Sequence, residues 1–278
     1  MPRFCANLSF LFTDVAFVDR FERAARAGFR GVEYLFPYAY AADDLAYRLR
    51  EYGLTQVLHN LPAGDWDGGE RGIACLPGRE AEFREGVERG IFYATTLGCT
   101  QLNCLAGLAP PGVSEAEIRS TFQTNLRYAA KRLKEQGIRL LIEPINSRID
   151  MPGFWLDTPR KAVALIAEMN ESAKSAAPTE TNLWLQYDIY HAQIMEGDLA
   201  RSIETYLGGI AHFQLADNPG RHEPGTGEIN YPYLFALLDR IGYSGWVGCE
   251  YRPLAAGDAS LAWARHWLEQ TRVSPTQK

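Results

Sequence analysis

The chain has 278 residues, 46% hydrophobic and 22% charged, with a formal net charge of −6. This is ordinary globular composition with enough length for a large core, and no stretch approaches the roughly 20 apolar residues of a membrane span. The negative charge and the lack of a basic cluster argue against nucleic acid as a partner. Residues 1–15 lack the pattern of a signal peptide, and the five cysteines contain no CxxC pair, so we expect a cytoplasmic protein with reduced thiols.

Eight apolar runs alternate with eight amphipathic segments along the chain. We expect strands at 3–8, 31–36, 54–61, 101–105, 139–145, 182–187, 210–215 and 245–250. We expect helices at 15–27, 42–52, 79–97, 114–136, 157–170, 199–207, from about 231 on, and at 258–271. Asp14 is expected to cap the first helix, and Ser114 to open the fourth as part of a capping box. Residues 272–278 are expected to form a frayed tail.

Strict alternation of strand and helix predicts a parallel sheet. Most of the strands are continuous apolar runs, as strands buried on both faces must be. Eight units in about 270 residues match a (β/α)8 TIM barrel, and we expect residues 1–278 to form one such domain. An open doubly wound sheet is the alternative. It is disfavoured because the segment 9–13 after the first strand has no glycine-rich phosphate loop.

In a barrel, side chains at the carboxyl ends of the strands converge on one mouth. Strands five to eight carry oxygen donors there, namely Glu143, Asp188, Gln214 and Glu250. Three carboxylates brought together repel one another, so a positive group must offset them. Oxygen ligands without thiolate select hard cations, so the pattern predicts a site for Mg²⁺ or Mn²⁺. Taken singly, each residue could instead be a cap, a salt-bridge partner or a hydrogen-bonded core group.

The loop after the seventh strand is longer than a structural connection needs to be and rich in polar residues. With its flanks it reads HFQLADNPGRHEPGTGEINY at 212–231. Together with IEPIN at 142–146, YDIYH at 187–191 and GCEYRP at 248–253, it resembles the hydroxypyruvate isomerase family. That family belongs to the xylose-isomerase-like barrels, and the resemblance covers essentially the whole chain, including HNLPAGDW at 59–66 and LNCLAG at 102–107.

The resemblance implies a (β/α)8 barrel with a divalent metal held by Glu143, Asp188, Gln214 and Glu250, and Glu143 and Glu250 as the acid/base pair. The implied reaction interconverts hydroxypyruvate and tartronate semialdehyde through a cis-enediolate. The expected partner is therefore a small hydroxy-oxo acid. Arg221 is the first candidate for its carboxylate, because guanidinium binds carboxylates with two prongs. His59 and His191 are candidates for its other oxygens, although each could be a structural hydrogen-bonding group.

Several alternatives stay open at this point. A four-carbon acid such as 2-oxotetronate would use the same acid/base pair. Ketose 3-epimerases usually have His where Gln214 stands, which counts against that activity. Phosphoester cleavage would need a histidine-rich multi-metal cluster and a basic DNA-binding face, and only five histidines and a net charge of −6 argue against it. A non-catalytic sugar-acid binding protein has no need of two glutamates. The loop 63–78 is a candidate lid, and the fourth helix and residues 34–40 are candidate surfaces for a homo-oligomer.

Overall fold

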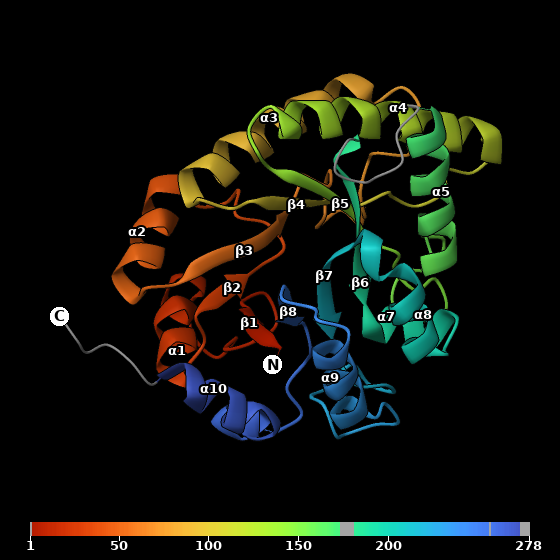
Figure 1. Ribbon diagram of the computed structural model, residues 1–278. Coiled ribbons are helices and arrows are strands. Elements are labelled where there is room, and N and C mark those ends of the chain that lie inside the picture. The colour runs from red at the N-terminus through yellow and green to blue at the C-terminus, as the bar shows by residue number, and fades with distance from the viewer. Residues whose placement is uncertain (1, 173–180, 256, 273–278) are drawn as a thin grey trace.

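The structure is a computed structural model that describes residues 2–172, 181–255 and 257–272 (Figure 1). Its strands are β1 Arg3–Asn7, β2 Gly31–Glu33, β3 Thr55–Asn60, β4 Gln101–Cys104, β5 Arg139–Ile142, β6 Leu183–Asp188, β7 Ile210–Leu215 and β8 Trp246–Cys249. Its α-helices are α1 Arg20–Ala27, α2 Ala42–Tyr52, α3 Glu80–Leu97, α4 Glu115–Lys134, α5 Pro159–Ser172, α7 Ile189–Met195, α8 Leu199–Tyr206, α9 Tyr231–Arg240 and α10 Arg265–Arg272. Short 3₁₀ segments are η1 Phe17–Asp19, η2 Leu207–Gly209 and η3 Gly257–Ala264.

The eight strands form one closed barrel in chain order, and every neighbouring pair is parallel. Closure is made by β1 and β8, where Cys5 pairs with Gly248 and Ala6 with Cys249. The helices lie around the outside of the strands, as Figure 1 shows. The predicted (β/α)8 barrel is therefore confirmed, and the open sheet is excluded. Every strand points its carboxyl end toward the same mouth, which is where the predicted site residues were expected.

Three helix predictions need correction. The first helix begins at Arg20 rather than at residue 15, because η1 precedes it, and Asp14 pairs with Arg23 instead of capping. A short helix, α7, follows β6 directly and was not predicted. The segment 258–271 divides into η3 and α10, and Arg272 is the last residue of α10 rather than part of a frayed tail. The rest of the predicted tail lies outside the described residues. The Ser114 cap is confirmed, since its side chain accepts a hydrogen bond from the Glu117 amide.

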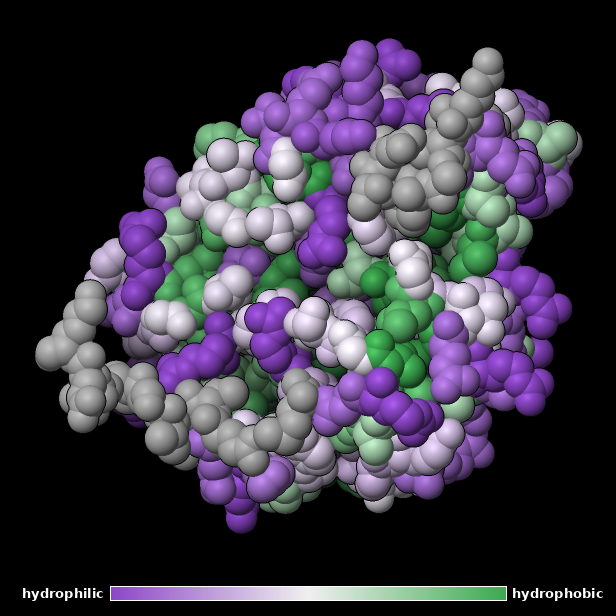
Figure 2. All heavy atoms as spheres, in the orientation of Figure 1, coloured by the Kyte–Doolittle hydropathy of each residue, from purple (hydrophilic) through white to green (hydrophobic). Residues whose placement is uncertain are grey.

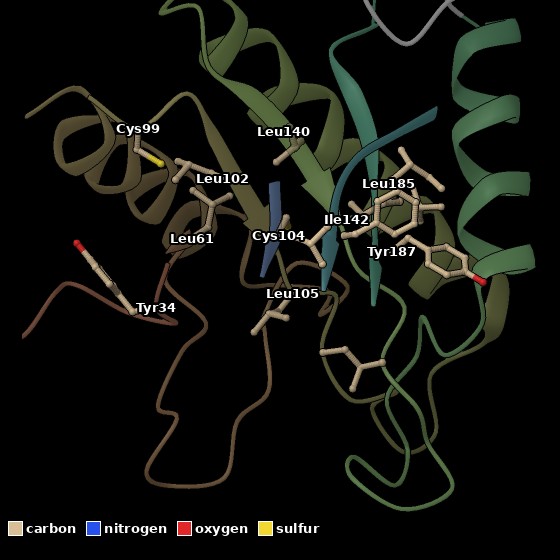
Figure 3. Packing of buried hydrophobic residues seen from close by; sticks show 14 of the residues in the cluster. Tyr34, Leu61, Cys99, Leu102, Cys104, Leu105, Leu140, Ile142, Leu185 and Tyr187 are labelled. Carbon is tan, nitrogen blue, oxygen red and sulfur yellow. The ribbon is translucent and has the colours of Figure 1, made fainter. Parts of the chain in front are cut away.

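The largest hydrophobic cluster lies between the barrel and its helices. Figure 3 shows Leu102, Leu140 and Leu185 among the packed side chains of adjacent strands. All five cysteines are free and buried, in agreement with the reduced thiols expected. Figure 2 shows mostly hydrophilic residues on the outward side of the helices, with hydrophobic ones in smaller groups. Among the described residues, no helix combines the length and apolar character needed to cross a bilayer.

The inside of the barrel contains a second, smaller hydrophobic cluster. Its buried members are Cys5, Val57, Leu58, Leu141 and Ala211, and Trp184 and Trp246 pack against them. This cluster closes the lower part of the interior, toward the amino ends of the strands. A cavity of about 510 Å³ opens below it, lined in part by Arg3 and Arg139. The upper interior is polar.

Candidate active site

The four predicted oxygen donors lie at the carboxyl ends of β5 to β8, as the sequence predicted. Glu143 and Glu250 follow β5 and β8 directly, Asp188 is the last residue of β6, and Gln214 lies within β7. All four side chains are buried. Because each strand alternates its side chains between the two faces, these positions point into the barrel above the apolar cluster. The barrel therefore brings together residues that are more than 100 positions apart in the sequence.

Glu250 is held at both of its oxygens. Its Oε1 accepts a hydrogen bond from Arg221 Nη2 at 2.5 Å. Its Oε2 accepts from Asn7 Nδ2 at 2.9 Å and from Gln214 Nε2 at 2.6 Å. The guanidinium of Arg221 supplies a positive charge beside the carboxylates, which the sequence argument had assigned to a metal alone.

Sequence reasoning missed Glu33, the last residue of β2, which is completely buried. Its Oε1 accepts from Asn7 Nδ2 at 3.1 Å and Gln214 Nε2 at 2.9 Å, and its Oε2 lies 2.7 Å from His212 Nε2. Burial acts to raise the pKa of Glu33. The nearby His212, together with the hydrogen bonds from His212, Gln214 and Asn7, outweighs burial and holds that pKa below its usual value. Glu33 is therefore a carboxylate beneath the site.

The amide of Gln214 presents its nitrogen, not its oxygen, to the carboxylates. Its Oε1 accepts a hydrogen bond from Gln186 Nε2 at 2.6 Å. Turning the amide over would place its oxygen against the oxygens of Glu33 and Glu250, where no donor would stand between them. The predicted role of Gln214 as an oxygen ligand is thus not the role it has in this hydrogen-bond network, in which it donates to two carboxylates.

The two carboxylate oxygens of Asp188 have different roles, one in capping a helix and one in the site. Its Oδ1 accepts from the backbone N–H groups of Tyr190 and His191 and so caps α7. Its Oδ2 is buried and has no hydrogen-bond partner within the described residues. His191 Nε2 lies 3.7 Å from that oxygen and 4.0 Å from Glu143 Oε1. Asn103 Nδ2 donates to the other oxygen of Glu143 at 2.9 Å.

Glu143, Asp188 and His191 form a donor set that fits a divalent cation. One ligand atom from each lies within 4.8 Å of the others, and all three side chains are buried. Asp188 Oδ2 accepts no hydrogen bond and has only the longer charge contacts with His191 and Arg221. It supports the same interpretation, because buried polar atoms are otherwise hydrogen-bonded. His191 thus lies in the site, where the sequence predicted a contact with substrate oxygens and not a metal ligand, and its Nδ1 lies 2.7 Å from Asn146 Nδ2.

Arg221 is placed by an unusual backbone conformation in the loop after β7, with φ of 58°. Its side chain lies over the rings of Phe10 and Tyr190, at 5.0 and 5.3 Å from their centroids. Besides Glu250, it donates to Asp150 Oδ1 at 3.2 Å. Asp150 was also missed from the sequence. The guanidinium is thus hydrogen-bonded to two protein carboxylates and lies 4.0 Å from a third, at Asp188 Oδ2. Its predicted contact with a substrate carboxylate stays a prediction.

Burial and crowding set the protonation of the two predicted catalytic glutamates. Burial raises the pKa of Glu143 well above its usual value, and the negative charges of Glu250 and Asp188 raise it further. Burial also raises the pKa of Glu250, to about 8, although Arg221 acts to lower it. Two carboxyl groups with raised pKa values can exchange protons near neutral pH. Burial lowers the pKa of His191 to about 4, so its imidazole is neutral and able to bind a cation.

The structure does not bring His59 into this cluster. The next residue, Asn60, accepts from Asn103 Nδ2 and so faces the site. His59 therefore points to the other face of β3. There its ring makes an edge-to-face contact with the ring of Tyr38, with the two centroids 5.9 Å apart. Burial lowers the pKa of His59 to about 4. Its predicted contact with substrate is not supported by this placement.

Two loops at this mouth are held by internal contacts. In the loop after β7, Asp217 accepts hydrogen bonds from the backbone N–H groups of Asn218, Gly225 and Ile229. In the candidate lid 63–78, Gly72 lies so close to the Leu105 carbonyl that an added Cβ would sit 2.4 Å from its oxygen. Asp217 therefore shapes its loop rather than the chemistry. The second half of the candidate lid is packed against the loop after β4, and lid movement stays a prediction.

Comparison with known proteins agrees with this fold. A sequence model of the family described as "Xylose isomerase-like TIM barrel" matches residues 21–271. Hydroxypyruvate isomerase of Escherichia coli (strain K12) is 52% identical over 95% of this chain and 98% of that protein. The chain belongs to the hydroxypyruvate isomerase family of xylose isomerase-like TIM barrels. The sequence-based assignment to this family, and with it to the isomerases, is confirmed.

Another relative and two similar solved structures carry different names. The 2-oxo-tetronate isomerase of Cupriavidus necator is 48% identical over 96% of this chain and 99% of that protein. A crystal structure of AP endonuclease, family 2, from Brucella melitensis is 48% identical, covers 96% of this chain and 99% of that chain, and has a TM-score of 0.90. A structure of L-ribulose 3-epimerase is 20% identical with a TM-score of 0.75, which supports the shared fold only.

Proposed function

We propose that this isomerase interconverts hydroxypyruvate and tartronate semialdehyde, with Glu143 and Glu250 as its acid/base pair. The observation that supports the pair is their shared setting: both carboxyl groups are buried at one barrel mouth, and both have raised pKa values. Groups of this kind can hold or give up a proton near neutral pH. The name of the 52% identical relative supports the three-carbon substrate.

The proton transfers follow from the different neighbours of the two glutamates. Arg221 donates to Glu250 and favours its ionised form, whereas Glu143 is bonded by the neutral amide of Asn103. We therefore assign Glu250 as the base that takes a proton from the hydroxymethyl carbon. Glu143 is then the acid that returns a proton to the neighbouring carbon. Between these steps the substrate is a cis-enediolate. When the proton returns to carbon, a proton also passes from the terminal oxygen to the neighbouring oxygen, and the carbonyl has then moved by one carbon.

A divalent cation, Mg²⁺ or Mn²⁺, is part of the proposal. Glu143, Asp188 and His191 are the side chains whose free donors suit it. Glu250 and Gln214, the other members of the predicted ligand set, are bonded to each other. When bound, the cation would act as a Lewis acid toward the negative charge that develops on the substrate oxygens. Asp188 would hold it through Oδ2, since Oδ1 is committed to α7.

Substrate turnover with and without metal tests the reaction and the cation together. Metal-stripped protein is incubated with hydroxypyruvate, with or without Mg²⁺ or Mn²⁺, and tartronate semialdehyde is followed by coupled reduction. We expect the aldehyde to form and its rate to depend on added metal. Metal-independent turnover would keep the isomerase and leave Asp188 and His191 as structural or substrate contacts. Absence of turnover under all conditions would contradict the proposed reaction.

A four-carbon acid is the second candidate, because the 48% identical relative is named 2-oxo-tetronate isomerase. The same assay with 2-oxotetronate compares kcat/KM for the two chain lengths, and the larger value identifies the substrate. Tight binding of either acid without turnover would instead favour a sugar-acid binding protein. Phosphoester cleavage is disfavoured by the donor set, since each candidate metal cluster among the described residues contains a single histidine.

A further inference from the structure

Glu33 is a buried carboxylate that the proposed proton transfers do not use. Its Oε1 accepts from Asn7 Nδ2 at 3.1 Å and from Gln214 Nε2 at 2.9 Å. The same two nitrogen atoms donate to Glu250 Oε2, at 2.9 and 2.6 Å. Two amide groups therefore bridge Glu33 and Glu250, and each amide uses its nitrogen for both carboxylates.

The carboxylate of Glu33 is held in a closely packed position inside the barrel. A Cβ at Gly248, on β8, would lie 2.2 Å from Glu33 Oε1 and 2.5 Å from its Oε2. Only glycine leaves room for the carboxylate at this point. From β7, His212 Nε2 lies 2.7 Å from Oε2, and from β1 the Cys5 thiol approaches the same oxygen at 3.4 Å. Three strands thus fix one side chain that touches no proposed reacting atom.

This arrangement decides which way the two amides point. Asparagine and glutamine amides each have a donating nitrogen and an accepting oxygen, whereas a carboxylate only accepts. Glu33 can bond Asn7 and Gln214 only if both present their nitrogens. In that orientation, the same nitrogens are the donors that hold Glu250. Without an acceptor at position 33, the two nitrogens would lose one of the two carboxylates that orient them, and the carboxyl group of Glu250 would be held less firmly.

We propose that Glu33 is a positioning residue, which fixes the amide nitrogens of Asn7 and Gln214 and through them holds the carboxyl group of Glu250 for proton transfer. The inference rests on the proposed function, because Glu33 acts through the proposed base. It assigns His212 and Gly248 the task of keeping Glu33 in place. It also gives Gln214 a hydrogen-bond role that does not depend on a metal.

Three variants separate positioning from simple packing. Glu33→Met keeps much of the volume but removes the acceptor, and we expect kcat to fall about 100-fold with KM changed less than about threefold. Glu33→Gln can still accept from both amides through its oxygen while its nitrogen faces His212, so we expect it to restore kcat to within about tenfold of the wild type. Gly248→Ala keeps the carboxylate but displaces it, and we expect a loss close to that of Glu33→Met.

Leu141→Val is the matched control, because Leu141 is buried in the lower interior with Cys5. It should lower the thermal midpoint and leave kcat unchanged. Wild-type kcat in Glu33→Met would overturn the inference, as would equal losses in Glu33→Met and Glu33→Gln that follow their thermal midpoints. If Glu33→Met does not fold, Gly248→Ala gives the same test. Full turnover in Glu250→Gln would instead contradict the proposed function, whereas an inactive Glu250→Gln beside an active Glu33→Met contradicts only this inference.

Discussion

The lower and upper parts of the barrel interior are built by the same strands and have opposite chemistry. Leu141 belongs to the apolar lower cluster, and Glu143, two residues later, lies in the polar upper site. On β6, Trp184 packs against the lower cluster, whereas Asp188 ends the strand in the upper one. Side chains two apart on a strand share a face. The same strands can thus carry a stabilising layer below and a chemical layer above.

The difference indicates a division of labour between stability and activity. The lower layer gains free energy by removing apolar surface from water. The upper layer gathers Glu33, Glu143, Asp188 and Glu250 with Arg221, and buried charges of this kind contribute little net stability. Active sites often trade stability for function in this way. Substitutions in the two layers should therefore separate activity from stability.

The upper layer would not be the chemical layer if activity survived loss of its carboxylates. We expect Glu143→Gln and Glu250→Gln each to lower kcat by about 10²- to 10⁴-fold, because each removes a proton-transfer group. The urea midpoint should stay the same or rise in Glu143→Gln, since repulsion among buried carboxylates is relieved, and should fall in Glu250→Gln, which leaves Arg221 without its buried ion-pair partner. Steady-state kinetics and urea unfolding measure the two effects. Glu85→Gln, exposed on α3, is the control, and near wild-type turnover in either active-site variant would refute the assignment.

The lower layer should show the reverse behaviour. Leu141→Ala leaves a cavity in the closed interior and should lower the free energy of unfolding by about 2–5 kcal/mol. The kcat of the folded variant should stay within about twofold of the wild type, because the carboxylates above it are held by hydrogen bonds to other strands. Urea unfolding and kinetics below the transition check this. A large fall in kcat with unchanged stability would mean that the layers are not separable.

The smallest expected effect is on how the free energy of unfolding depends on pH, and it concerns Glu250 in the upper layer. Burial raises the folded-state pKa of Glu250 to about 8, above its unfolded value of about 4.3. Its contribution to stability is therefore complete below the unfolded pKa and is lost as pH rises toward the folded pKa. Between pH of about 6.5 and 8, Glu250 should lower the unfolding free energy by at most about 1.4 kcal/mol per pH unit, and Glu143, whose pKa is also raised, adds a fall of the same sign.

Glu250→Gln should reduce this slope by the share of Glu250, because it removes that titrating group while Glu143 remains. Urea unfolding of both proteins across that range measures the slopes. The range begins at the ordinary pKa of histidine, so His191 and His59, whose pKa values are lowered to about 4, oppose the fall only near its lower end. A wild-type protein that gains stability as pH rises through this range would contradict the raised pKa of Glu250.

The barrel and four of its site residues could be predicted because their signals are local. Strand–helix alternation is visible in short windows, and Glu143, Asp188, Gln214 and Glu250 stand at the ends of recognisable strands. Glu33 and Asn7 could not be placed in the same way. Their partners are 181 and 243 residues away, and only closure of the barrel brings them together. The one available signal was a charged residue inside the apolar run 31–36.

The predictions from sequence that were wrong or incomplete also have local physical causes. For His59, the strand was recognised but its face was not, since the neighbouring Asn60 is the residue that turns inward. Helix α7 was missed because it has seven residues and begins immediately after β6, without a loop to separate them. Arg221 was expected to be free for substrate. Its engagement with Asp150 depends on a turn after β5 that no sequence pattern specifies.

The double duty of Asp188 has a practical consequence for anyone who redesigns this mouth or dissects it by mutation. Its Oδ1 caps α7 while its Oδ2 faces Glu143 and His191. Alanine at this position removes a cap and a charge at once, so an alanine scan would overstate the chemical importance of the residue. Asparagine keeps an acceptor for the helix and removes only the charge. Position 188 thus tolerates a change of chemistry only from residues that can also begin a helix.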